Sequence, residues 1–97
     1  MSLGGKGVIS VLSNVLPKET HDMTQFCLNG DFKSAAELQL KYLDLINALF
    51  CEVNPIPAKT AMAEMGFCDV EMRLPLCEME DATKARLMAS LKKHGIL

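Results

Sequence analysis

The chain has 97 residues, 12 of them acidic and 10 basic, so its net charge at neutral pH is −2. The basic residues are scattered and only Lys92 and Lys93 are adjacent, which argues against a nucleic-acid-binding surface. No run of about 18 apolar residues predicts a membrane span, and the first residues lack the pattern of a signal peptide. We therefore expect a cytoplasmic protein.

Residues 4–17 are the only segment whose pattern predicts a buried strand. Val8, Ile9 and Val11 are β-branched, glycines precede them, and Ser13 follows where a strand would end. A strand of four or five residues needs partners at its edges and cover on its faces. No second segment of this quality follows. We therefore interpret the chain as the C-terminal piece of a larger protein.

Four helices are predicted in the rest of the chain. Their ends carry standard signals: proline in the first turn, an aspartate cap before the longest helix, and glycines just beyond the last turns. The expected ranges are 17–28, 32–50, 58–65 and 80 or 81 to 94. The predicted fold class of the isolated chain is all-α with four helices and at most a short N-terminal strand.

Apolar residues make up 49% of the chain, including seven methionines. A chain of this length buries only about 60–65% of its surface by itself. This composition fits a piece that a partner surface covers, although a compact bundle with a methionine-rich core remains an alternative.

The cysteines and histidines do not form a recognisable metal or catalytic pattern. Cys27, Cys51, Cys68 and Cys77 are 24, 17 and 9 residues apart, and neither His21 nor His94 stands at a metal-ligand interval from them. We expect the cysteines to be small buried apolar residues in a reducing compartment. No Ser, Cys or Asp stands in an inferable triad relation to either histidine, so we expect no general base among them.

Four motifs in a fixed order carry a resemblance to a known family. They are Gly4-Gly5-x-Gly7-Val8-Ile9-Ser10-Val11-x-Ser13-Asn14-Val15-x-Pro17, Gly30-Asp31-Phe32-x-x-Ala35, Glu52-x-Asn54-Pro55-Ile56-Pro57-x-Lys59 and Arg73-Leu74-Pro75-Leu76. Together they resemble the last third of the dihydrodipicolinate synthase family, from Gly4 to Leu97. The Asn-Pro-Ile-Pro run is less similar to related aldolases such as N-acetylneuraminate lyase.

The resemblance implies a fold and a division of the chain. The parent fold is a (β/α)8 TIM barrel followed by a helical C-terminal domain. Residues 4–30 would be the last strand and last helix of the barrel, and residues 31–97 the C-terminal helical domain. Residues 1–3 would be left by an expression vector.

The resemblance also implies an activity. The family condenses pyruvate with aspartate 4-semialdehyde through a lysine Schiff base, in lysine biosynthesis, as a cytoplasmic homotetramer without a further cofactor or a metal. Ile9 matches a position that contacts pyruvate, and the alternative is a barrel-filling isoleucine. No catalytic residue is expected in this segment, because the reactive lysine matches neither Lys6 nor Lys59. Lys59 is expected to bind loop carbonyls or a carboxylate.

Two expectations follow for the chain by itself. It should be catalytically inactive, and it should self-associate as a dimer or larger through apolar surface that the barrel would otherwise cover. The alternative from another class is a free-standing helical interaction module. The two hypotheses differ in whether roughly 200 further residues precede the chain, which is the usual remainder of such a barrel.

Overall fold

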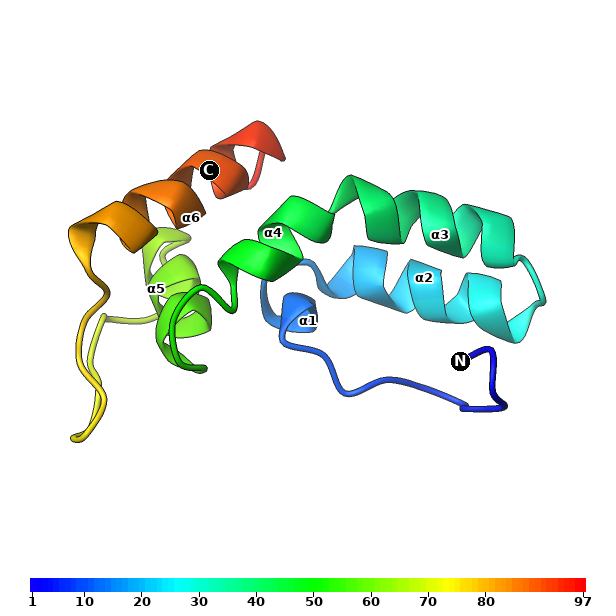
Figure 1. Cartoon of the computed structure of the whole chain (residues 1–97), viewed down its shortest axis with the longest axis horizontal. Helices are drawn as coiled ribbons and strands as arrows, with labels where there is room; N and C mark the ends of the chain where they lie inside the picture. Colours follow the sequence, from blue (N-terminus) through cyan, green and yellow to red (C-terminus); the bar gives the residue numbers. More distant parts are fainter.

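The computed structural model describes residues 1–97 and contains six helices and no strand. The helices are α1 Leu12–Val15, α2 Pro17–Leu28, α3 Phe32–Lys41, α4 Leu43–Ala48, α5 Ile56–Glu64 and α6 Asp81–Lys93. They form an elongated body of 41 × 27 × 21 Å, with α2 and α3 at one end and α5 and α6 at the other (Figure 1). The all-α prediction is confirmed. None of these helices combines the length and the apolar character that crossing a membrane requires.

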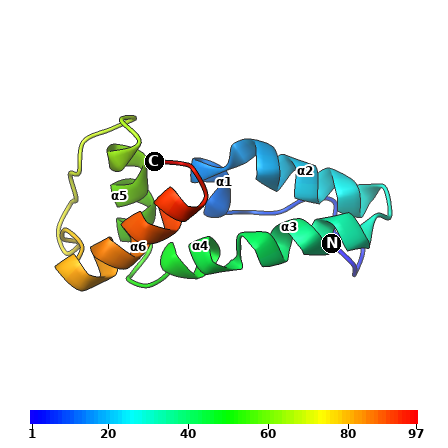
Figure 2. The same cartoon turned by 90° about the horizontal axis from the view of Figure 1, so that it is seen from above.

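Helices α2 and α3 form an antiparallel pair whose ends follow from local sequence (Figure 2). Pro17 occupies the first turn of α2, where its missing N–H is not needed. Gly30 turns the chain with a φ of 80°, a conformation that favours glycine. The carboxylate of Asp31 then accepts hydrogen bonds from the Ser34 hydroxyl and backbone N–H, which hold the pKa of Asp31 below its usual value.

The helix predicted over 32–50 is divided at Tyr42 into α3 and α4, so the single long helix is wrong. The hydrogen-bond ladder passes through the break, because the Tyr42 N–H reaches Leu38 and its carbonyl accepts from Ile46. Tyr42 itself departs from helical geometry, with φ −101° and ψ 8°. Its buried ring lies 5.0 Å from the His94 ring, so a distant contact accompanies the bend.

Helices α4, α5 and α6 enclose the best-buried part of the core. The leucines at positions 45, 49, 87 and 91 are fully buried there. Helix α5 begins at Ile56, two residues before the predicted start. Helix α6 takes a cap from outside its own sequence, because Glu52 Oε1 accepts a hydrogen bond from the Glu80 N–H at 3.2 Å. These contacts close this end of the molecule.

The predicted buried strand at residues 8–11 is not formed. Residues 5–9 make no backbone–backbone hydrogen bond, and the side chain of Ile9 is fully exposed. The physical reason is the one that the sequence raises: a lone strand has no partner for its N–H and C=O groups. The sequence leaves open whether residues 4–16 stay a strand, fray or become helical without the barrel. In the structure the segment runs past α2 and α3 and then enters the short helix α1 (Figure 1).

Candidate functional site at the end of the N-terminal segment

The one residue predicted to touch a substrate, Ile9, lies between two hollows of the surface. Residues Ile9, Ser10 and Val11 line both hollows, and Phe50 lines both from the end of α4. The structure therefore places the exposed side chain of Ile9 between the two hollows. The role of Ile9 in binding pyruvate stays a prediction.

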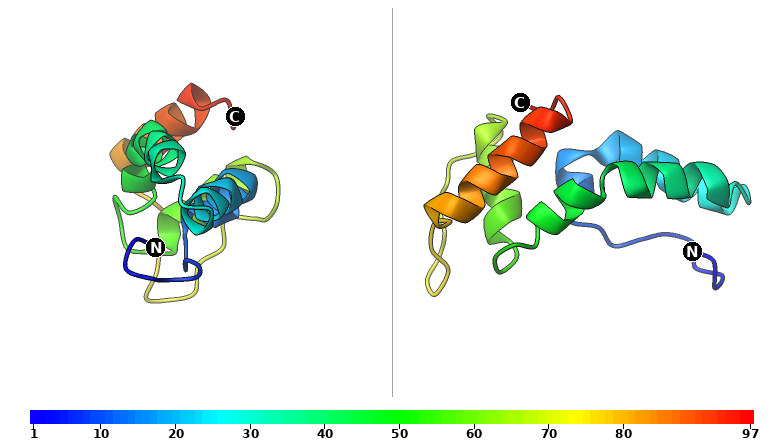
Figure 3. Two further views of the ribbon diagram at one scale, coloured as in Figure 1. Left: turned by 90° about the vertical axis from the view of Figure 1, so that its right-hand side faces the viewer. Right: turned by 45° about the horizontal axis from the view of Figure 1, so that its top comes forward.

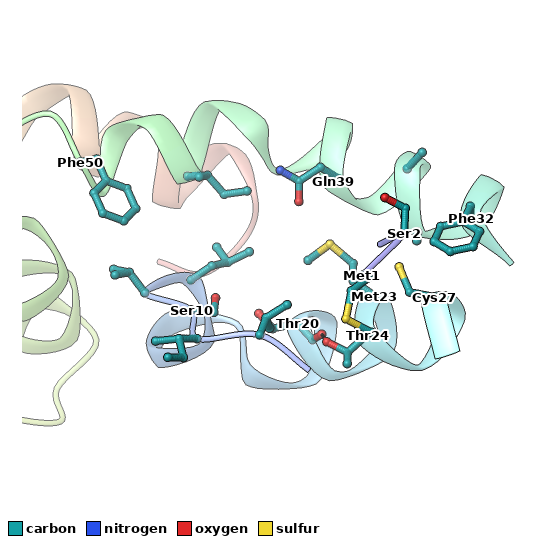
Figure 4. A pocket seen from close by; sticks show the side chains of 17 residues that line it. Met1, Ser2, Ser10, Thr20, Met23, Thr24, Cys27, Phe32, Gln39 and Phe50 are labelled. Carbon is teal, nitrogen blue, oxygen red and sulfur yellow. Dashed lines mark hydrogen bonds between the residues drawn. The ribbon is translucent and has the colours of Figure 1, made fainter. Parts of the chain in front are cut away.

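The first hollow, of about 640 Å³, lies between the N-terminal segment and helices α2, α3 and α4. Figure 4 shows that its walls carry mainly apolar and sulfur-containing side chains, among them Met23, Cys27 and Phe32. Its threonines are already engaged, because Thr20 and Thr24 donate their hydroxyls to carbonyls one turn earlier in the chain. Such a surface suits packing against apolar groups more than polar chemistry.

The second hollow, of about 440 Å³, is more mixed in chemistry. Besides apolar residues of α5, it is lined by Ser10, Asn14, Asn54, Lys59 and Cys68. Sequence patterns alone assign no role to the two asparagines. Their only signal was membership of two motifs that are distant in the sequence and meet at this hollow. This arrangement offers amide groups and a cation beside Ile9.

The side-chain ammonium group of Lys59 is engaged in a hydrogen bond and is not free to act as a nucleophile. Its ammonium group donates a hydrogen bond to the backbone carbonyl of Glu71, in the loop between α5 and α6. This confirms the prediction that Lys59 binds a loop carbonyl. The Lys59 side chain thus ties α5 to the loop that follows it.

Two serines fix the chain direction immediately after Ile9. Ser10 Oγ accepts a hydrogen bond from the Ser13 N–H at 3.2 Å, and Ser13 Oγ donates to the Ser10 carbonyl at 2.6 Å. Asn14 Nδ2 also donates to the Val11 carbonyl at 3.0 Å. These bonds close the first turn of α1. The sequence indicated a turn at Ser13 but not this reciprocal pair.

A polar cluster that local sequence spacing does not reveal joins α4 to the end of α6. Asp44 Oδ1 lies 2.8 Å from His94 Nε2, and Asp44 Oδ2 accepts from Lys93 at 3.0 Å and from Ser90 at 3.2 Å. Desolvation raises the pKa of Asp44, but the hydrogen bonds from His94 and Lys93 outweigh it and hold that pKa well below its usual range.

The sequence shows no triad relation for His94, and the fold nevertheless brings Asp44 within hydrogen-bond distance of it. The cluster is still not a catalytic triad, because the Ser90 hydroxyl donates to the carboxylate and not to the imidazole. The pairs are about 50 residues apart in sequence, so no local spacing could reveal them.

The remaining candidates are dispersed. No group of three or more His, Cys, Asp or Glu side chains is arranged to hold a metal ion. The four cysteines are unpaired. Cys68 and Cys77 are exposed, so the expectation of buried cysteines is wrong for these two, and Cys27 and Cys51 are only half-buried. Cys68 lies in the loop after α5, which leaves the helical core.

The comparisons with known proteins decide the family. The model of the dihydrodipicolinate synthetase family matches residues 1–94. The chain belongs to this family. Among curated members, 4-hydroxy-tetrahydrodipicolinate synthase of Lachnoclostridium phytofermentans is 55% identical over all 97 residues, and that of Clostridium perfringens is 52% identical. These names favour the synthase over a related aldolase.

Solved members of the dihydrodipicolinate synthetase family have the same fold in the matching region. The structure from Aquifex aeolicus superposes with a TM-score of 0.96 at 45% identity over 98% of this chain and 32% of its own. That from Thermotoga maritima gives a TM-score of 0.95 at 42% identity over 99% of this chain and 32% of its own. This chain thus spans about a third of the curated relatives' length, 33% for both named above.

Proposed function

We propose that this chain acts as the C-terminal third of a lyase that condenses pyruvate with aspartate 4-semialdehyde through a lysine Schiff base, in lysine biosynthesis. The observation that carries the proposal is the match of the whole chain, at 55% identity, to one third of a 4-hydroxy-tetrahydrodipicolinate synthase. A free-standing interaction module does not account for such a match.

In this proposal the two ends of the chain have different tasks. Residues 4–30 supply the last strand and helix of the barrel, and residues 31–97 form the C-terminal helical domain. The exposed Ile9 joins the pyruvate pocket, since sites in such barrels lie at the carboxyl ends of the strands.

The chain supplies structure and contacts, and the reactive lysine comes from outside it. A Schiff-base lysine must be free to attack and have a lowered pKa, whereas Lys59 is engaged with the Glu71 carbonyl. Incubation of the isolated chain with pyruvate and borohydride should therefore leave its mass unchanged. A stable adduct at Lys6 or Lys59 would contradict this assignment.

A chimera tests the proposal as a whole. In this chimera the chain replaces the matching C-terminal third of the Clostridium perfringens synthase. The two sequences are 52% identical over all 97 residues of this chain. We expect the chimera to condense the two substrates and to be trapped by borohydride at a lysine outside this chain. A folded chimera without either property would contradict the proposed function.

The assembly and location of the full protein are part of the same proposal. We propose a cytoplasmic homotetramer. One solved relative, 43% identical to this chain, is described as a monomeric dihydrodipicolinate synthase variant, so family membership alone does not fix the assembly. Sedimentation of the full-length protein checks this point, and a monomer at micromolar concentration would contradict it.

A further inference from the structure

The helices of this chain close one core from their own side chains. The core combines buried residues of α1, α4, α5 and α6 with Leu16, Tyr42 and Met79 from the connections between helices. Every helix packs against at least one other, and α1 contacts both α2 and α5. The first residue of the chain that packs against this core is Val11. The core is therefore complete whether or not the segment before Val11 pairs with neighbouring strands.

The backbone of this chain has the arrangement that it has inside an intact relative. The Aquifex aeolicus structure superposes with a TM-score of 0.96 over 98% of this chain and 32% of its own, so about two-thirds of that structure has no counterpart here. A surface that already has its bound arrangement loses little free energy to reorganisation when it binds. The chain therefore presents a ready-made face to the part of the barrel that precedes it.

The first hollow is the surface to which that part would bind. Its walls are mainly apolar, and Figure 4 shows Phe32 at one end of the hollow and Phe50 at the other. Val8 and Ile9 also line it. In a barrel, residues 8–11 would have a strand on each edge, about 4.8 Å away. Strands of parallel barrels are apolar on both faces, so their side chains suit the walls of this hollow.

We propose that this chain is a self-contained module that binds the preceding strands and helices of the full-length protein through the first hollow, without needing a covalent link to them. This inference rests on the proposed function, which supplies the binding partner. A peptide link adds no contact at the hollow and only raises the effective concentration of the two pieces, to about millimolar for a short flexible linker. An enzyme that is cut in front of this chain should therefore stay assembled and active.

The test uses the chimera of the proposed function with a protease site in front of Met1. The loop that leads into a barrel strand lies at the face opposite the carboxyl ends of the strands, so the cut is remote from the substrates. At micromolar concentration the cut chimera should condense the substrates within about twofold of the uncut rate. On dilution the cut chimera should lose activity and regain it when the isolated chain is added, whereas the uncut chimera should not respond.

A pair of substitutions on α3 locates the binding surface. Phe32→Ser alters a half-exposed side chain of the hollow, and the control Leu40→Ser alters an exposed side chain that lines neither hollow. We expect Phe32→Ser to raise the dissociation constant of the cut pieces roughly 10- to 30-fold, the scale of an aromatic anchor at an interface. The uncut Phe32→Ser chimera and both forms of Leu40→Ser should match the unaltered protein. Equal weakening by the two substitutions would overturn the assignment to the hollow.

Native mass spectrometry reads the binding independently of activity. The cut chimera is diluted and then concentrated with an excess of isotope-labelled isolated chain, and we expect the labelled chain to replace the unlabelled one. Addition of the labelled chain without replacement would identify a second copy as the occupant of the hollow and overturn the proposal. Failure of the labelled chain to enter, or separation of the cut pieces at micromolar concentration, would also overturn it. An uncut chimera that folds but is inactive would contradict the proposed function, whereas exchange of the labelled chain would still support the binding.

Discussion

The two ends of the molecule differ in how completely they bury their apolar side chains. Around α4, α5 and α6, four leucines are fully buried, whereas Val8, Ile9, Phe32 and Phe50 are about half or fully exposed around the first hollow. In the right-hand view of Figure 3 the N-terminal segment runs apart from the helices until it enters α1. Burial of such a side chain is worth about 1.5–3 kcal/mol. The exposed side chains around the first hollow form an apolar surface that a partner could cover, and Phe67 and Leu74 are also exposed in the loop after α5.

The largest effect expected from this contrast is self-association of the isolated chain. The apolar residues around the first hollow should pack between copies, because no other surface is present to cover them. Sedimentation at micromolar concentration should report a dimer or larger. A micromolar dissociation constant corresponds to a binding free energy of about 8 kcal/mol. Phe32→Ser and Phe50→Ser together should shift the equilibrium to monomer. A monomeric unaltered chain at this concentration would contradict the account.

The next effect separates the two ends by substitution. In the isolated chain, Leu49→Ala removes a fully buried side chain and should lower the free energy of unfolding by about 2–5 kcal/mol. Ile9→Ala should change it little, because the Ile9 side chain is exposed. In the chimera, Ile9→Ala should instead weaken pyruvate binding. Urea unfolding of Leu49→Ala and Ile9→Ala in the isolated chain measures these two changes. Similar losses of unfolding free energy for both variants would contradict the difference in burial between the two ends.

The polar cluster at Asp44 should contribute less to the free energy of unfolding than the buried Leu49 side chain does. Asp44→Asn should lower the free energy of unfolding by about 1.5 kcal/mol. This is at the low end of the range for hydrogen bonds to charged groups, because the Asp44 side chain is partly exposed. Because the folded state lowers the pKa of Asp44, this contribution is present above the usual value of 3.8 and is lost as the pH falls below it. The control is Asp22→Asn, which breaks an exposed pair with Lys18 and should cost little.

Unfolding curves of these variants at neutral and acid pH decide the matter. The difference in the free energy of unfolding between Asp44→Asn and the unaltered chain should become smaller as the pH is lowered. A difference that stays constant or grows would show that the Asp44 carboxylate does not stabilise the packing of α4 against α6.

The smallest effect is expected at Glu52. Glu52→Ala removes the acceptor of the Glu80 N–H and should destabilise α6 by about 1 kcal/mol, as for a lost helix cap. Glu52→Gln keeps one side-chain oxygen and should lie near the unaltered chain. Thermal melting of both variants checks this, and equal losses would mean that the charge, and not the acceptor, matters.

The sequence predicted those features that depend on neighbouring residues. Pro17, Asp31 and Gly30 set helix ends through their own backbone or side-chain chemistry, and the predicted ends of α2 and the start of α3 are confirmed. The bend at Tyr42 accompanies its contact with His94, which lies 52 positions later. Helix α1 depends on the burial of its side chains. Such contacts leave no periodic signal.

The candidate site was predictable only in part. Ile9 came from the motif resemblance, since its periodicity alone indicates a buried strand residue. The second hollow brings residues near position 10 together with residues near position 59, a meeting that only the fold can create. The Asp44 cluster likewise joins residues about 50 positions apart.

Hydrogen exchange at residues 8–11 is the most direct test of the central claim that these residues form a strand only within a larger barrel. The amides should exchange rapidly in the isolated chain, where residues 5–9 have no backbone partners. In the chimera they should be strongly protected, because neighbouring strands bind them on both edges. Equal exchange in the two proteins would contradict the account.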